Sequence, residues 1–183
     1  MTSSFLNQLV ARFEGLEVTL NNLDAATGDG DHGTTILRGL RAAETSCGSS
    51  AKAFRMAAGG ASGSLFALLI NAIEEVSLEK IPLGEALAKA ADQISQLGQA
   101  KAGDKTMLDA LIPAAEAALA DLENPTAAAI KAAQEGAALT KAMSAKRGRA
   151  KYVENAGVGH IDAGAKSVAE ILTALEPNSR SCA

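Results

Sequence analysis

Alanine occupies forty of the 183 positions, whereas aromatic residues make up only 3% of the chain. Alanine favours the helix more than any other residue, because it loses no side-chain entropy there. Small side chains also let neighbouring helices approach one another closely. We therefore expect an all-α fold, without strands, hairpins or sequence repeats.

Apolar residues recur at helical spacing along most of the chain, and glycine, proline or capping residues interrupt them. We expect about eight helices with short connections, arranged as an antiparallel barrel or bundle. Asp104 is predicted to cap the helix that starts at Lys105, and the basic, glycine-rich segment 144–161 is predicted to be a loop. The predicted helices span 3–22, 34 into the forties, 52–58, 61–77, 82–97, 105–122, 125–143 and 162–176.

The length suits one domain at 1–176, followed by a tail at 177–183 that we expect to be disordered. A net charge of -4 argues against a nucleic-acid partner. The longest apolar run, Leu65 to Ile70, is too short to span a bilayer, and no secretory signal is visible. Cys47 and Cys182 lack the spacing of metal ligands. We expect a cytoplasmic protein without a membrane partner.

The stretch from Gly28 to Thr35 reads G-D-G-D-H-G-T-T, and Asp24 lies four residues before it. Its glycines match the G-x-G-x-x-G pattern of dinucleotide loops, but no strand precedes them, as that motif requires. A calcium EF-hand beginning at Asp29 is excluded, because Thr34 and Leu40 stand where that loop needs glycine and glutamate. A turn that merely caps a helix, with solvated carboxylates, is the structural alternative.

Asp24, Asp29 and Asp31 can converge because the glycines between them let the chain turn at a helix end. Three carboxylates held together repel one another unless a cation neutralises them. Mg²⁺ takes oxygen ligands and commonly shares carboxylates with substrate phosphates. The backbone N–H groups of His32 to Thr35, at a helix N-terminus, favour an anion. The pattern therefore predicts a site for a metal and a phosphate.

Three further stretches carry chemistry of the same kind. The small-residue segment 59–64, G-G-A-S-G-S, leads into an apolar helix, although close helix packing also explains it. The segment 103–109, G-D-K-T-M-L-D, is another turn into a helix. The segment 146–149, K-R-G-R, holds the densest positive charge of the chain. Basic runs are usually solvated, but cations grouped on an acidic protein also indicate an anionic ligand.

Taken together, these stretches resemble the L subunit of dihydroxyacetone kinase (DhaL), the nucleotide-binding part of that family. The five matching segments occur in the family's order and cover nearly the whole chain, which makes the match specific. They are L-D-A-A-T-G-D-G-D-H-G-T at 23–34, G-G-A-S-G at 59–63, G-D-K-T-M-L-D-A-L at 103–111, K-R-G-R-A-K-Y at 146–152 and G-H-I-D-A-G-A-K-S at 159–167.

The resemblance implies an α-helical barrel with the nucleotide at one end. It implies that Asp24, Asp29 and Asp31 hold Mg²⁺, as two ions, against ADP or ATP. No side chain is expected to become covalently modified, because phosphoryl transfer relies mainly on positioning and charge stabilisation. The implied nucleotide-binding residues are His32, Gly33, Thr34, Thr35, Ala61, Ser62, Gly98, Thr106, Met107, Arg149, Asp162, Ala163 and Gly164.

The resemblance further implies a kinase subunit that works with a K subunit, which holds a ketose such as dihydroxyacetone. Its donor is either a bound ADP that a phosphocarrier of the sugar phosphotransferase system (DhaM-like) rephosphorylates, or exchangeable ATP. A non-catalytic, nucleotide-sensing module and a domain serving fatty-acid phosphorylation are the alternatives. Ala163 and Ser64 replace prolines common in the family and Thr35 replaces an asparagine, so a four-carbon ketose is also considered.

Overall fold

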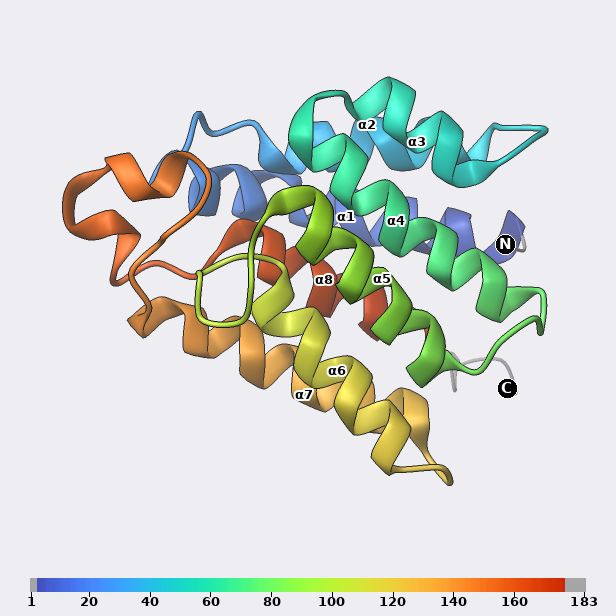
Figure 1. The fold of residues 1–183 in the computed structure, drawn as a ribbon. Helices are drawn as coiled ribbons and strands as arrows, with labels where there is room; N and C mark the ends of the chain where they lie inside the picture. Colours follow the sequence, from blue (N-terminus) through green and yellow to red (C-terminus); the bar gives the residue numbers. More distant parts are fainter. Residues whose placement is uncertain (1–2, 177–183) are drawn as a thin grey trace, which may run out of the picture.

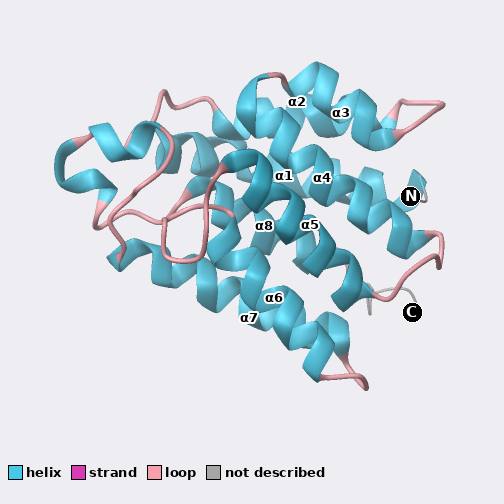
Figure 2. Cartoon of the chain, viewed as in Figure 1, coloured by secondary structure: helices cyan, strands magenta, loops and turns pink. Residues whose placement is uncertain are grey.

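The computed structural model describes residues 3–176, so the predicted disorder of the tail 177–183 lies outside the described residues. Every described residue lies in a helix or a loop, and residues 3–176 contain no strand (Figure 2), which confirms the all-α prediction. The α-helices are α1 (Ser3–Ala25), α2 (His32–Glu44), α3 (Ser50–Ala58), α4 (Gly60–Ser77), α5 (Leu83–Gly98), α6 (Leu108–Ala120), α7 (Pro125–Leu139) and α8 (Ala163–Thr173). Three short 3-10 helices, Thr140–Ala142, Arg149–Tyr152 and Glu154–Gly157, lie between α7 and α8.

The α-helices of the described chain close into a barrel (Figure 1). Each helix contacts the next one along the chain, and α8 contacts both α7 and α1. Each helix contributes apolar side chains to one continuous core, and full burial of a large one contributes about 1.5–3 kcal/mol. Fully or nearly fully buried members include Leu9, Phe13, Ile36, Phe54, Ile70, Leu87, Leu111, Ile130 and Leu172.

Small residues bring the helices close together. Gly136 of α7 faces the backbone of α6, where an added Cβ would collide with the carbonyl oxygen of Asp109 and lie 3.2 Å from its carbonyl carbon. Gly39 of α2 faces the ring of Phe54 on α3 in the same way, with ring atoms 2.6 Å from such a Cβ. The scarcity of large side chains in the sequence therefore corresponds to close crossings between neighbouring helices.

An ion-pair group joins α1 to α8, where the barrel closes. The buried Glu170 of α8 lies between Arg12 of α1, whose Nε donates to it at 2.7 Å, and Lys166, whose Nζ lies 2.6 Å away. Burial by itself would raise the pKa of Glu170, but hydrogen bonds from Lys166 and Arg12 outweigh it and hold that pKa below its usual value. Glu170 is therefore ionised where the first and last helices meet.

The segment before α6 differs from the prediction. The helix begins at Leu108 rather than Lys105, and Asp104 is not its cap, because its carboxylate accepts the N–H of Lys101 at 3.1 Å. Asp109 instead organises this loop: its carboxylate accepts the N–H groups of Gly103 at 2.5 Å and Thr106 at 2.7 Å. This carboxylate reaches back from the first turn of α6, and the loop is three residues longer than expected.

The remaining helix ends agree closely with the sequence pattern. Asp162 is the N-cap of α8, and its carboxylate accepts the N–H of Ala165 at 2.7 Å. Helix α7 ends at Leu139 and passes into a 3-10 turn, a few residues before the predicted end at 143. Within the described chain, no helix is long and apolar enough to cross a bilayer.

Candidate active site

A cavity of about 730 Å³ opens at one end of the barrel. It is formed by the α1–α2 turn, the α3–α4 junction, the α5–α6 loop, the basic part of the α7–α8 connection and the start of α8, all on the left in Figure 1. All the predicted site residues but two line it, namely Asp24, Asp29, Asp31, His32, Thr35, Ala61, Ser62, Gly98, Thr106, Met107, Arg149, Asp162, Ala163 and Gly164. Segments from five parts of the sequence therefore meet at one cavity.

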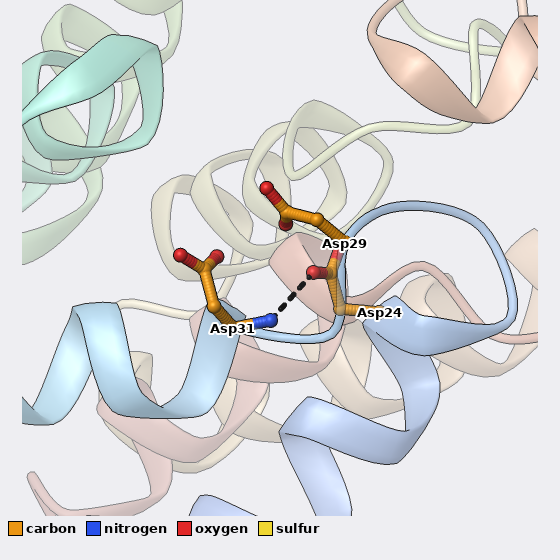
Figure 3. A group of neighbouring side chains, drawn as sticks. All are labelled: Asp24, Asp29 and Asp31. Atoms are coloured by element: carbon orange, nitrogen blue, oxygen red, sulfur yellow. Dashed lines mark hydrogen bonds between the residues drawn. The ribbon is translucent and has the colours of Figure 1, made fainter.

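The turn between α1 and α2 brings the three aspartates together (Figure 3). The Oδ2 atom of Asp24, in the last turn of α1, accepts the N–H groups of Gly30 at 2.8 Å and Asp31 at 3.1 Å. Glycine at position 28 leaves room for this carboxylate, because a Cβ there would collide with Oδ1 of Asp24 unless that side chain moved. One carboxylate oxygen from each of Asp24, Asp29 and Asp31 lies within 4.8 Å of the others. This spacing fits a shared divalent cation with oxygen ligands.

A cation from a distant part of the chain faces this cluster. The guanidinium of Arg149, in the α7–α8 connection, forms an ion pair with the carboxylate of Asp29. The pair holds the pKa of Asp29 below its ordinary value and raises that of Arg149. Since both side chains are more than half exposed, the pair is open to solvent and to competing ions. It places positive charge beside the aspartates, where a phosphate chain would need it.

His32 lies behind the cluster, at the first position of α2. Its Nε2 is 2.9 Å from the hydroxyl of Ser167 on α8, and its ring packs against Phe66 with centroids 5.7 Å apart. Burial lowers the pKa of His32 to about 4, despite the opposing charge of Asp24. The imidazole is therefore neutral near pH 7, and it fixes α2 against α8 rather than adding charge to the cavity.

Gly33 and Thr34, although predicted to bind nucleotide, do not line the cavity. Gly33 faces α1, because a Cβ on it would collide with the carbonyl oxygen of Glu17. The N–H and the hydroxyl of Thr34 are engaged on the same side, by Asn21 Oδ1 at 3.1 Å and Glu17 Oε1 at 2.8 Å. Successive residues of a helix point in different directions. Of the first four residues of α2, 32–35, only His32 and Thr35 therefore line the cavity.

The α3–α4 junction provides a second set of backbone donors. Gly59 and Gly60 both adopt positive φ, at 70° and 61°, which places the first turn of α4 at the cavity wall. Gly63 donates the first hydrogen bond of this helix, to the carbonyl of Gly59 at 2.9 Å. The N–H groups of residues 60–62 therefore precede the helical ladder, as is typical of anion sites at helix N-termini.

Three cationic residues that the sequence reasoning did not assign to the site also line the cavity: Arg38, Lys105 and Arg147. Arg38 donates to the carbonyls of Ala57 at 2.8 Å and Ala58 at 2.9 Å, at the end of α3. Its position three residues after Thr35, on the same face of α2, was the signal that could have identified it. Lys105 and Arg147 lie in the segments 103–109 and 146–149 that the sequence singled out, although neither was assigned to the site individually.

Part of the cavity lining is apolar. Leu65, Phe66, Ile94 and Leu108 form this part together with Met107. Asp162 borders this region, and burial raises the pKa of its carboxyl to about 6, although the hydrogen bond from Ala165 and the charge of Lys105 both oppose the rise. A polar, carboxylate-rich side and an apolar side within one cavity suit a ligand that is charged at one end and flat and apolar at the other.

The DAK2 domain pattern matches residues 26–177 of this chain. L-erythrulose kinase of Pectobacterium atrosepticum is 36% identical over 181 residues, covering 85% of this chain and 31% of that protein. The ADP-binding subunit DhaL of the PTS-dependent dihydroxyacetone kinase of Lactococcus lactis is 30% identical, covering 95% of this chain and 94% of that subunit. The dihydroxyacetone kinase of C. freundii, solved with AMP-PNP and Mg²⁺, superposes with a TM-score of 0.73 at 30% identity, covering 94% of this chain and 33% of the other.

These findings define the class: the chain belongs to the DAK2 domain family. The predicted resemblance to the L subunit of dihydroxyacetone kinase is thereby confirmed, and so is the all-helical fold. The chain spans about a third of the length of several curated relatives, the erythrulose kinase among them. It spans nearly all of the L. lactis DhaL subunit.

Proposed function

We propose that this chain is the nucleotide-binding subunit of a dihydroxyacetone-type kinase. It transfers a phosphoryl group to a short ketose that a separate K subunit holds. The observation that carries the proposal is the group of three aspartates, with carboxylate oxygens within 4.8 Å of one another, at the charged side of a cavity of about 730 Å³. Clefts of this volume hold nucleotide-sized ligands.

The residues at the charged side would act on a diphosphate or triphosphate. Asp24, Asp29 and Asp31 would hold two Mg²⁺ ions, and Asp24 is already oriented by two backbone N–H groups. When bound, Mg²⁺ neutralises charge on the phosphate oxygens. The N–H groups of Ala61 and Ser62 would donate to the phosphates, because they point from the first turn of α4. Arg149 adds positive charge beside the aspartates, and its ion pair with Asp29 is exposed, so a phosphate could compete for it.

The residues at the apolar side would receive the base and sugar. Leu65, Ile94 and Met107 offer apolar surface for a planar base, and Gly98 leaves room beside them. Thr106, Asp162, Ala163 and Gly164 also line the cavity, and we assign them to the space between the base and the phosphates. The side chains that line the cavity need not form a covalent intermediate, because phosphoryl transfer depends on placement and on charge stabilisation.

The relatives support this reading and its partners. The L. lactis relative is an ADP-binding subunit of a PTS-dependent kinase, and it has nearly the same extent as this chain. We therefore propose a K-subunit partner, a cytoplasmic location and, for the form that retains ADP, a DhaM-like phosphocarrier. The erythrulose kinase relatives support a four-carbon ketose as a second substrate candidate beside dihydroxyacetone. The nucleotide-sensing alternative is not favoured, because all three aspartates are present and close together.

Two measurements test this function. Protein purified without added ligand is denatured, and the nucleotide that it releases is identified. Retained ADP means the phosphocarrier-dependent form, whereas an empty protein that binds Mg-ATP reversibly means the ATP-exchanging form. Turnover is then measured by ³¹P NMR with a K subunit, dihydroxyacetone and either donor. Nucleotide binding without any ketose phosphate would refute the kinase proposal in favour of a sensing module.

A further inference from the structure

The connection between α7 and α8 leaves the barrel and returns to almost the same point. We call residues 140–161 the excursion loop, which is the orange segment on the left in Figure 1. Its ends are joined by a hydrogen bond from Gly159 N–H to the carbonyl of Lys141 at 2.8 Å. Only Thr140, Ala145 and Gly157 of this loop are buried. Apolar packing therefore contributes little to holding it, and polar contacts must do so.

Lys105 makes the first of these contacts. Its side chain comes from the α5–α6 loop and is only 2% exposed. Its ammonium donates to the carbonyl oxygens of Thr140 at 2.6 Å and His160 at 2.5 Å, one at each end of the excursion loop. Gly157 packs against the same side chain, because a Cβ on it would lie 3.4 Å from Cε of Lys105. One buried ammonium thus ties together the two ends of the loop.

Asp104, the preceding residue, holds the middle of the same loop. Its carbonyl oxygen accepts the N–H of Lys146 at 3.0 Å. Its carboxylate is 3% exposed and lies 3.7 Å from Nζ of Lys146 and 3.6 Å from Nε of Arg147. Arg149, which pairs with Asp29, follows two residues after Arg147. This attachment is therefore only two residues along the chain from the arginine that pairs with the aspartate cluster.

The backbone at Lys105 indicates that its side chain is needed there. Lys105 has a φ of 60°, in the left-handed region where glycine is favoured. Gly103, two residues earlier, has a φ of 82° and is a glycine. A lysine in this conformation is strained unless its surroundings compensate. Its two short hydrogen bonds to the excursion loop provide that compensation.

We propose that Asp104 and Lys105 are positioning residues: they fasten the excursion loop to the barrel so that Arg149 stays beside Asp29 at the cavity. The proposal rests on the proposed function, because the position of Arg149 affects binding only if the cavity takes a Mg-nucleotide. Neither residue needs to touch the ligand. Lys105 borders the cavity, so direct contact between its ammonium and a phosphate is the competing explanation that the experiments must separate.

The first experiment observes the loop itself. Tyr152 is the only tyrosine of the chain, which has no tryptophan, so intrinsic fluorescence anisotropy reports the loop without a label. Trypsin provides a second readout, because Lys146, Arg147, Arg149 and Lys151 all lie in the loop. Lys105→Met is compared with Lys101→Met, an exposed lysine of the same α5–α6 loop. Both variants lose one tryptic site, so their cleavage patterns are matched.

We expect Lys105→Met to give faster decay of the Tyr152 anisotropy and about tenfold faster cleavage within 146–151, with unchanged helical circular dichroism. Lys101→Met should behave as the unchanged protein. If Lys105→Met does not fold, Asp104→Asn takes its place. That change keeps an oxygen for the N–H of Lys101 but removes the charge that faces Lys146 and Arg147. Cleavage of the folded variant, Lys105→Met or its replacement Asp104→Asn, at the rate of Lys101→Met would overturn the proposal.

The second experiment is a double-mutant cycle on Mg-ADP affinity, measured by calorimetry with Lys105→Met and Arg149→Ala. We expect each change to raise Kd about tenfold, as loss of an orienting partner typically does. The Kd of the double variant for Mg-ADP should be within about twofold of the Kd of Arg149→Ala, because Lys105 acts through Arg149. Additive losses of about 100-fold would show direct contact and overturn the proposal. If the protein without substitutions binds no Mg-nucleotide, the proposed function is refuted instead. The Tyr152 and trypsin readouts still decide in that case whether the loop is fastened.

Discussion

Gly33 of α2 lies against the carbonyl group of Glu17 on α1, so closely that a Cβ would collide with that oxygen and lie 3.0 Å from its carbonyl carbon. The opposing atoms belong to the backbone and cannot rotate away. Gly33→Ala should therefore force the two helices apart and destabilise the fold by about 1–3 kcal/mol. Urea unfolding followed by circular dichroism measures the change.

Gly15 provides the matched control for that substitution. It lies in α1 with no atom within 4 Å of the position that a Cβ would occupy. Gly15→Ala should stabilise the protein by about 0.5–1 kcal/mol, because alanine is the better helix former. Equal effects of the two substitutions would contradict the packing explanation for Gly33.

Asp31→Asn tests the metal role of the aspartate cluster. The side chain of Asp31 makes no capping hydrogen bond to α2, and the carboxylates of Asp24 and Asp29 lie near it. Removing the negative charge of Asp31 should therefore not weaken the fold. Phosphoryl transfer should fall by more than about 100-fold, because loss of a ligand exceeds the effect of losing an outer-shell partner. Asp92→Asn, an exposed carboxylate on α5, is the control that should retain activity. Full activity of Asp31→Asn would remove this residue from the site.

Asp162 gives the stability of the ligand-free protein a specific pH dependence. Burial raises its pKa from the usual 3.8 to about 6 in the folded state. Between these values the folded protein binds a proton that the unfolded chain does not, so stability falls as pH rises through this window. Asp162→Asn, which does not titrate, should be more stable by about 3 kcal/mol above pH 6, with the gain vanishing below about pH 4. Unfolding curves in EDTA measure this difference, and a gain independent of pH would contradict the assignment.

Glu170→Gln tests how the barrel closes between α1 and α8. The change leaves Arg12 and Lys166 without their shared carboxylate. Both cations are about one-third exposed, which reduces the loss below the 3–5 kcal/mol typical of a fully buried pair, to about 1–3 kcal/mol. The free energy of unfolding, compared with that of Glu135→Gln on the surface of α7, measures it. A cost no larger than that of the control would show that this group adds nothing to closure.

The local signals in the sequence were sufficient for most of the fold. Alanine content and apolar spacing indicated the helices, and the last helix was predicted to start at Asp162, whose carboxylate caps the first turn of that helix. The convergence of the aspartates was also readable, since the glycines between them permit one tight turn. These features depend on residues that are close along the chain.

Features that depend on distant residues were missed. Asp104 was predicted as a helix cap, but Asp109 organises the loop before α6 and frees Asp104 to face Lys146 and Arg147. Gly33 was predicted to bind nucleotide, and the sequence did not indicate that it also lies against the carbonyl group of Glu17 on α1. Local sequence patterns do not determine which helices and loops pack against one another. The partners of these residues depend on that packing.

The most direct test of the account is a calorimetric titration of ADP into the ligand-free protein, once with excess Mg²⁺ and once with EDTA. If the three aspartates hold Mg²⁺ against the phosphates, they repel the bare nucleotide. We therefore expect binding with Mg²⁺ to be at least about 100-fold tighter than in EDTA. Equal affinity under both conditions, or no binding at millimolar Mg²⁺ and nucleotide, would contradict the assignment of the Gly28–Thr35 turn and Asp24 as a metal and phosphate site.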